Sequence, residues 1–177
     1  MIVIRRARVS DAPGIGAVHV ACWRSAYAGL LPDGFLANLS VRRLSAFYEH
    51  QLRLGAGLFV AASYGEPAAP GVLGFASSGR SRDPRLAEGE VETLYVLDDY
   101  RDRGLGGELL RASARHLAKM GCRSVYAWVL SENPARFFYA RMGGRCVAQG
   151  STTVGGEPIG QCAFAWDPIE SLLDVNA

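Results

Sequence analysis

Apolar and polar residues follow two different periods along this chain, and the period indicates which element to expect. Apolar residues recur every three to four positions where helices are expected, and they form short dense runs where strands are expected. Segment 28–40 carries Gly and Pro residues and breaks the first helix. The expected helices are 10–27, 41–55, the segment from the glycine-rich stretch to Met120, and 133–143. The expected strands are 2–7, 57–64, 71–79, 90–97, 124–130, 145–154 and 157–166.

The middle of the chain has the order strand, helix, strand, which predicts a βαβ unit. The two strands, 90–97 and 124–130, should be parallel, because the connection is long enough for a crossover. The second of them is apolar at nearly every position, as in a strand that is buried on both faces. The strands before and after this unit are separated by turn residues and read as hairpins. The expected fold class is therefore α/β, with a mixed sheet.

Length and composition favour one domain that spans residues 1–177, because 177 residues with 49% hydrophobic content can bury one core of ordinary size. No segment approaches the ~18 apolar residues of a membrane span. The first residues place arginines after a short apolar run and read as a strand, not as a signal peptide. We expect a soluble, cytoplasmic protein without a membrane partner.

Charge and cysteine content exclude several classes of function. The formal charge of +2 is too small for a nucleic-acid groove, although Lys119 is the one lysine among 19 basic residues. The four cysteines show neither C-x-x-C spacing nor a histidine pair nearby, so no metal site is expected. We interpret Cys22, Cys122, Cys146 and Cys162 as buried free thiols.

The stretch "YRDRGLGGELL" places three glycines where a helix begins. A helix start carries a partial positive charge and unpaired N–H groups, and it therefore binds anions. Gly104, Gly106 and Gly107 would let a phosphate approach the backbone, and Arg101 and Arg103 could add charge-assisted hydrogen bonds. Neither the Walker motif nor the dinucleotide fingerprint fits. The alternative, a tight turn in which glycine serves only its positive φ, stays open.

The wider segment "ETLYVLDDYRDRGLGGELL" is similar to the acetyl-CoA-binding core of the GNAT superfamily of N-acetyltransferases. The family signature, [QR]-x-x-G-x-[GA], is met by Arg101, Gly104 and Gly106. The order of the expected elements also matches, so the resemblance covers most of the chain. Segment 18–40 resembles the front half of bacterial members, and segment 132–145 resembles their fourth helix.

The resemblance implies a mostly antiparallel sheet in which the two parallel strands splay apart around the coenzyme, flanked by about four helices. The cofactor would be acetyl-CoA, with coenzyme A as product. Main-chain groups of the first parallel strand would bind pantetheine, and the glycine-rich loop would bind the pyrophosphate. The implied cofactor-binding residues are Leu94, Tyr95, Val96, Arg101, Arg103, Gly104, Leu105, Gly106, Gly107 and Asn133.

The resemblance also implies direct attack of an amine on the thioester, with no covalent enzyme intermediate. Tyr139 would protonate the departing thiolate, and Glu92 would act as base through water. In an unbroken strand Glu92 would share a face with Glu90, but family members often carry a bulge here. Glu90 or water alone therefore remains an alternative base. The structural alternatives are that Tyr139 is an aromatic residue packed under its helix and that Glu92 is a solvated carboxylate.

The acceptor is expected to be a primary amine of a small molecule or a peptide. The resemblance places Trp23 and Tyr27 beside the acceptor, with His19 as a further candidate. It also implies that Trp128 reaches the cleft from its strand. Packing in the core is an alternative role for each. The arginines of segment 79–85 could meet an acidic acceptor group or only be solvated. The competing function is a non-catalytic acyl-CoA-binding sensor of the same fold, and a homodimer is left open.

Overall fold

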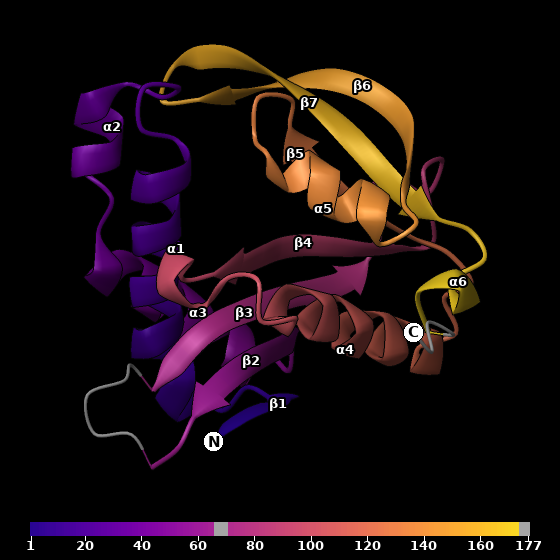
Figure 1. Ribbon diagram of the computed structural model, residues 1–177, viewed down its shortest axis with the longest axis horizontal. Coiled ribbons are helices and arrows are strands. Elements are labelled where there is room, and N and C mark those ends of the chain that lie inside the picture. Colours follow the sequence, from indigo (N-terminus) through magenta and orange to yellow (C-terminus); the bar gives the residue numbers. More distant parts are fainter. Residues whose placement is uncertain (66–70, 174–177) are drawn as a thin grey trace.

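The structure, a computed structural model, describes residues 1–65 and 71–173, and is built on one seven-stranded sheet (Figure 1). The strand order is β1-β2-β3-β4-β5-β7-β6. Within the described residues, no helix combines the length and apolar character that crossing a membrane requires. The strands are β1 Ile2–Arg6, β2 Gly57–Ser63, β3 Val72–Arg80, β4 Gly89–Val96, β5 Val125–Leu130, β6 Arg145–Val154 and β7 Glu157–Trp166. The helices are α1 Ala12–Ala26, α2 Asp33–Ala37, α3 Val41–Arg53, α4 Leu105–Lys119, α5 Ala135–Arg141 and α6 Glu170–Leu173.

The sheet has one parallel pair, β4 with β5, and its other described pairs are antiparallel. This confirms the expected mixed sheet and the parallel pair on either side of α4. The pairing of β4 with β5 is very short, since it joins only Gly89 to Val125 and Glu90 to Tyr126. Beyond Glu90 the two strands part, while β5 continues along β7 as far as Leu130.

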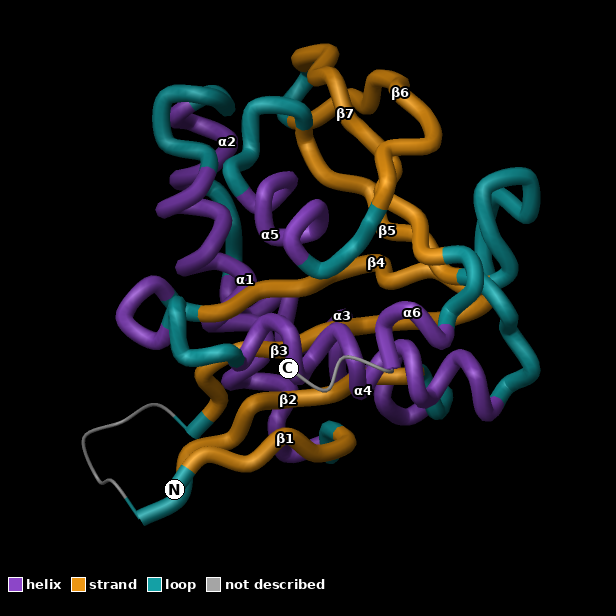
Figure 2. Tube along the Cα trace, turned by 45° about the vertical axis from the view of Figure 1, so that its right-hand side comes forward, coloured by secondary structure: helices purple, strands orange, loops and turns teal. Residues whose placement is uncertain are grey.

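Helices cover both faces of the sheet, because β2 and β3 bury side chains on both sides. Leu58 and Phe75 pack in a cluster with α1 and α3 residues, whereas Leu73 packs in a second cluster with Leu109 of α4. The alternation of strand side chains thus feeds two apolar layers. Figures 1 and 2 show α1 and α3 on one side of the sheet and α4 on the other.

The β6–β7 hairpin extends from the far edge of the sheet toward α2 (Figure 1). A Cβ at Gly155, at the hairpin tip, would lie 3.0 Å from the Phe35 ring, so the tip rests directly on that ring. Leu31 and Leu36 join the same apolar cluster, together with Ile159 of β7. The hairpin and the α1–α2 region therefore enclose one end of the space between β4 and β5.

Two sequence-based interpretations are wrong for this structure. Cys22 and Cys122 are buried free thiols as expected, but Cys146 and Cys162 form a disulfide between β6 and β7. The hairpin register, with its irregularity between Cys146 and Ala148, places the two α-carbons 6.2 Å apart, and sequence spacing gives no sign of this. Segment 28–40 was expected only to break a helix, but it contains the short helix α2.

Candidate functional site

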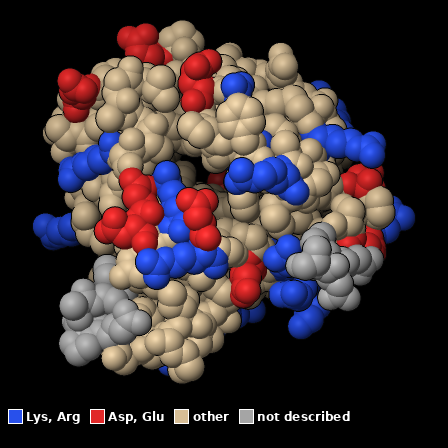
Figure 3. Space-filling view, in the orientation of Figure 1, with Lys and Arg blue, Asp and Glu red and all other residues tan. Residues whose placement is uncertain are grey.

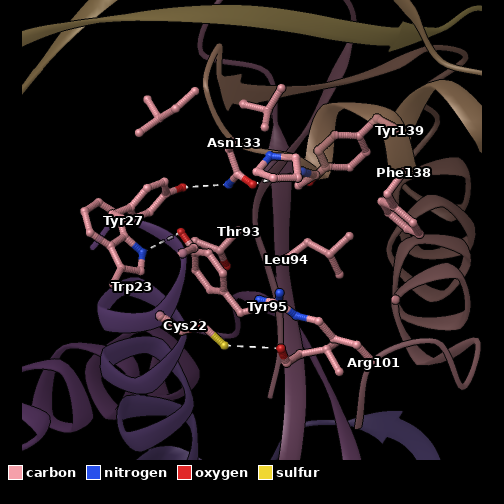
Figure 4. A pocket seen from close by; sticks show the side chains of 18 of the residues that line it. Cys22, Trp23, Tyr27, Thr93, Leu94, Tyr95, Arg101, Asn133, Phe138 and Tyr139 are labelled. Carbon is pink, nitrogen blue, oxygen red and sulfur yellow. Dashed lines mark hydrogen bonds between the residues drawn. The ribbon is translucent and has the colours of Figure 1, made fainter. Parts of the chain in front are cut away.

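The divergence of β4 and β5 opens a cleft of about 830 Å³ near the middle of the molecule. Figure 4 shows its side chains pointing inward from both strands and from the helices beside them. Figure 3 shows a hollow on this face, with acidic and basic side chains gathered beside it. The predicted residues that line the cleft are Trp23, Tyr27, Glu92, Leu94, Tyr95, Val96, Arg101, Gly104, Leu105, Gly106, Gly107, Trp128, Asn133 and Tyr139.

The cleft edge of β4 leaves main-chain groups without a strand partner among the described residues. On its other edge, β4 pairs with β3 through Ala76↔Leu94, Phe75↔Tyr95 and Gly74↔Val96. On the cleft side, β5 has already departed after Glu90. An extended ligand with amide groups could therefore hydrogen-bond to this edge as a further strand would.

A bulge in β4 separates the two glutamates that sequence analysis considered as bases. Ser77 pairs with Thr93 and Ser78 pairs with Val91, so Glu92 is the extra residue. Glu92 is exposed and lines the cleft, whereas the Glu90 side chain is only 1% exposed and does not. Glu90 and Glu92 therefore do not share a face of β4, as they would in an unbroken strand.

Glu90 is held by Arg82, whose Nε donates to Oε2 over 2.9 Å and whose second nitrogen donates to Oε1. Burial opposes ionisation of Glu90, but the hydrogen bonds from Arg82 outweigh it, and the pKa of the carboxyl is lowered. A buried carboxylate that is already paired and lies outside the cleft is a poor candidate for the base.

The glycine-rich loop ends in a left-handed turn that opens α4. Gly104 precedes the helix with φ of +79°, and a Cβ there would meet nothing within 4 Å. A Cβ at Gly106 would meet the Phe138 ring at 3.4 Å. The first amides of α4 have no helical acceptor and form an anion-binding end. The absence of side chains at Gly104, Gly106 and Gly107 leaves room for a phosphate group to reach them.

The two arginines of this loop have different surroundings. Arg101 lines the cleft and forms an ion pair with Asp98, with nitrogen and oxygen 2.8 Å apart. Arg103 does not line the cleft; its guanidinium lies over the Tyr100 ring and donates to the Asp99 carbonyl over 3.2 Å. Of the predicted cofactor-binding residues, Arg103 is thus the one that the structure leaves outside the cleft.

Tyr139 lies on α5 and is the most buried of the predicted catalytic residues, with 6% of its surface exposed. Its ring contacts Phe138, Phe164 and Trp166. Its side chain lines the cleft (Figure 4). Burial raises the pKa of this phenol, so Tyr139 is protonated at neutral pH. The packing role and the catalytic role are therefore compatible.

Asn133 joins two walls of the cleft. Its Oδ1 accepts from the Ala135 amide over 2.9 Å, which caps α5. Its Nδ2 donates to the Tyr27 hydroxyl, also over 2.9 Å (Figure 4). The side chain thus binds the first amide of α5 and also bridges to α1, a contact that the sequence did not suggest.

The predicted acceptor residues differ in where they lie. The Trp23 indole donates to the Tyr95 hydroxyl over 2.8 Å and packs at 5.0 Å from the Tyr27 ring. Trp128 reaches the cleft from β5. His19 lies outside it, where its Nδ1 forms a 2.8 Å hydrogen bond with Tyr48. Burial lowers the pKa of His19 to about 4, so it is neutral at physiological pH.

Sequence reasoning missed several polar residues of the cleft. Thr93 lines it and shares a 2.7 Å hydrogen bond with Ser77 of β3, which also donates weakly to Glu92. Thr152 and Gln161 line it from the β6–β7 hairpin. Only the sheet register brings the hairpin to the cleft, so no local motif marks these two residues.

The sequence model of the acetyltransferase (GNAT) family matches residues 23–144. This chain belongs to that family. Two bacterial relatives extend the match. An uncharacterized N-acetyltransferase of Bacillus subtilis, YuaI, is 28% identical over 97% of this chain and 96% of its own. An L-methionine sulfoximine/L-methionine sulfone acetyltransferase of Pseudomonas aeruginosa is 32% identical over 75% and 73% of the two chains.

Solved structures share the fold. The yncA protein of Salmonella typhimurium, solved with its cofactor acetyl-CoA, has a TM-score of 0.68 at 23% identity and covers 100% of this chain and 96% of its own. The PaiA N-acetyltransferase of Thermoplasma acidophilum, solved with coenzyme A, has a TM-score of 0.67 at 19% identity, with 91% and 98% covered. The GNAT chain described here is thus an acyltransferase whose co-substrate is acetyl-CoA.

Proposed function

We propose that this chain transfers the acetyl group of acetyl-CoA to a primary amine of a small molecule or peptide, by direct attack within a ternary complex. The amine nitrogen forms a bond to the carbonyl carbon, and the bond from that carbon to sulfur breaks. One proton leaves the nitrogen, and one proton reaches the sulfur. The products are an N-acetyl amide and free coenzyme A, with no acyl group carried by the enzyme.

The parting of β4 from β5 carries this proposal. It leaves an edge of β4 at 94–96 without a strand partner among the described residues, beside a helix start that is free of side chains at Gly104 and Gly106. An extended chain with amides can hydrogen-bond to the strand edge along its length, and a diphosphate at its end can bind at the helix start. Leu94, Tyr95 and Val96 would bind the pantetheine arm, and residues 103–107 the diphosphate. Asn133 would also contact the coenzyme.

Tyr139 would be the acid. A thiol of pKa near 8.5 leaves as thiolate, and protonating it is worth roughly 2 kcal/mol at pH 7. Tyr139 lines the cleft, and its phenol is protonated at neutral pH. Burial raises the pKa of the phenol, and the same surroundings would raise that of the thiol, so the proton can still pass to sulfur.

Glu92 would be the base, acting through water. Freeing the lone pair of a lysine-like amine with pKa ~10.4 costs roughly 4 to 5 kcal/mol at pH 7, so an adjacent carboxylate is valuable. The bulge turns Glu92 into the cleft, whereas Glu90 is committed to Arg82. This contrast favours Glu92 over Glu90 and leaves water alone as the competing possibility.

The experiment combines catalysis with binding. Purified protein is mixed with acetyl-CoA and a panel of primary amines that includes a peptide, and free thiol release is followed while calorimetry measures acetyl-CoA binding. We expect tight binding and amine-dependent thiol release. Binding without release for any amine would favour the sensor function, and absence of binding would remove both. The protonated phenol of Tyr139 on the cleft wall favours the enzyme, because a sensor has no thiolate to protonate.

A further inference from the structure

The charges that line the cleft are distributed unevenly. Arg101 and Asp102 belong to the glycine-rich loop, and Arg141 belongs to the last turn of α5. The end where β4 and β5 first part has a different lining. There Glu92 lines the cleft from β4, two residues after Glu90, the last residue of β4 that pairs with β5. An acceptor beside Glu92 meets a carboxylate, whereas Arg101 is paired with Asp98, and Met142, the residue after Arg141, lies beside Gly107 of the glycine-rich loop.

Aromatic and neutral side chains make up the rest of this end. Trp128 lies two residues after Tyr126, and Glu92 lies two residues after Glu90, the last paired residue of β4. Trp128 and Glu92 therefore each lie two positions beyond the last residue of their strand that takes part in the β4–β5 pairing. The hairpin adds Thr152, Val154 and Gln161. A cleft lined by a carboxylate and an indole is a favourable setting for an ammonium group, through charge pairing and cation–π attraction.

A cation in the neighbouring pocket is already engaged. Arg82 lines a neighbouring pocket of about 590 Å³ that shares Glu92 and Thr93 with the cleft. Its guanidinium binds both oxygens of the buried Glu90. Removing it from Glu90 to bind an acceptor would leave a buried carboxylate unpaired, which is strongly unfavourable.

Resting on the proposed function, we propose that the acceptor is a primary amine on an apolar or aromatic body that carries no carboxylate next to the amine. Glu92 attracts the ammonium form and repels an α-carboxylate, and the two arginines that line the cleft, Arg101 and Arg141, belong to the glycine-rich loop and to the last turn of α5. This substrate class differs from that of the amino-acid derivatives named for the Pseudomonas relative.

The test compares three amines of one shape: phenethylamine, phenylalanine amide and phenylalanine. Thiol release from acetyl-CoA is measured, with kcat/KM expressed per free-base amine. We expect the first two to be used at least tenfold better than phenylalanine. Phenylalanine amide has a group of the same size as the carboxylate of phenylalanine but without its charge. It therefore distinguishes charge repulsion from steric exclusion. Equal or better use of phenylalanine would overturn the inference and point to Arg82 as a carboxylate site.

Binding of the same amines to the coenzyme A complex, followed by tryptophan fluorescence, keeps the test independent of turnover. Preferential binding of phenethylamine and the amide with no turnover would sink the proposed function but support the acceptor class. Failure of both to bind, or preferential binding of phenylalanine, would overturn the acceptor class while leaving acetyl-CoA binding intact.

A gain-of-function variant completes the test. Gln161→Arg places a cation on the hairpin wall of the cleft. It should raise the use of phenylalanine relative to phenethylamine at least fivefold. Gln149→Arg is the matched control, because Gln149 lies on the same hairpin, is exposed and does not line the cleft. An unchanged ratio in Gln161→Arg, or the same change in both variants, would contradict the proposed role of charge.

Discussion

Asn133 and Tyr27 are 106 positions apart in sequence, yet the Asn133 side chain donates a 2.9 Å hydrogen bond to the Tyr27 hydroxyl. The bond joins the start of α5 to the end of α1, on opposite walls of the cleft. The same side chain caps α5 through the Ala135 amide. One residue therefore connects local helix geometry to the width of the site.

Three variants separate these two roles. Tyr27→Phe removes the bridge, Asn133→Ser keeps a capping oxygen but is too short for the bridge, and Asn133→Ala removes both. We expect losses of unfolding free energy of about 0.5–1.5 kcal/mol for each of the first two. Asn133→Ala should lose a further 0.5–2 kcal/mol or so from the cap. Urea denaturation measures all three. Equal losses for Asn133→Ser and Asn133→Ala would show that the cap adds nothing.

Gly106→Ala should uncouple coenzyme binding from stability. Gly106 lies in the first turn of α4, where alanine is favoured over glycine by up to ~1 kcal/mol, and the new methyl group would only touch Phe138. Thermal unfolding should therefore be unchanged or improved. Acetyl-CoA affinity should fall at least tenfold, because the methyl group would lie where the diphosphate approaches. Calorimetry checks the affinity.

Gly104→Ala is the informative comparison for that variant. At φ of +79° an alanine costs roughly 1–2 kcal/mol, although no atom lies within 4 Å of the added Cβ. In Gly104→Ala the free energy of unfolding should fall. Acetyl-CoA affinity should fall as well, because the loop is distorted. Undiminished acetyl-CoA affinity in both variants would remove the loop from the binding site.

Tyr139→Phe should lower kcat by one to three orders of magnitude and leave acetyl-CoA affinity nearly unchanged. Removing the hydroxyl takes away the proposed proton donor, whereas the ring contacts with Phe164 and Trp166 remain. Steady-state kinetics with calorimetry makes the comparison, and Phe164→Leu is a control that alters the packing instead. Wild-type turnover in Tyr139→Phe would eliminate it as the acid.

Glu92→Gln should discriminate between amines of different basicity. An amine with pKa ~10.4 needs help to lose its proton at pH 7, whereas one near 7.7 costs only about 1 kcal/mol to deprotonate. The variant should therefore slow the first kind by ~10²-fold or more and the second kind much less. Initial rates at several pH values would show it. A uniform loss for both amines would indicate positioning instead of proton removal.

His19 should make stability depend on pH. The unfolded state binds a proton near pH 6.5, but burial lowers the pKa of folded His19 to about 4. The contribution of neutral His19 to the free energy of unfolding is thus fully present above pH 6.5. It is lost as pH falls from 6.5 toward 4, with a slope approaching ~1.4 kcal/mol per pH unit. His19→Gln should flatten this slope between pH 6.5 and 5 in urea denaturation. His50→Gln, on the exposed surface of α3, is the control and should keep it.

Most of the fold could be predicted because it depends on local patterns. The dense apolar run 124–130 and the glycines of the loop are sufficient to place β5 and the start of α4, and the parallel pair follows from the length between the strands. The resemblance then indicated the residues of the cleft, and of those it named as site residues Arg103 and His19 lie outside.

The remaining features depend on contacts between distant segments. The bulge that separates Glu92 from Glu90 arises from the register of β3, and the Cys146–Cys162 disulfide arises from the register of β6 and β7. His19 has the same helical spacing as a cleft residue, but its neighbours Tyr48 and Phe75 come from other elements and surround it. Such placements are not encoded in any short stretch of sequence.

The early separation of β4 from β5 leaves the sheet divided into two parts that share only two rungs of backbone pairing. A molecule that spans the gap holds the two parts of the sheet together. Since a ligand specific for the native state stabilises by RT ln(1 + [L]/Kd), a hundredfold excess over Kd adds ~2.7 kcal/mol. The supply of acetyl-CoA would thus govern how long the protein survives as well as how fast it works.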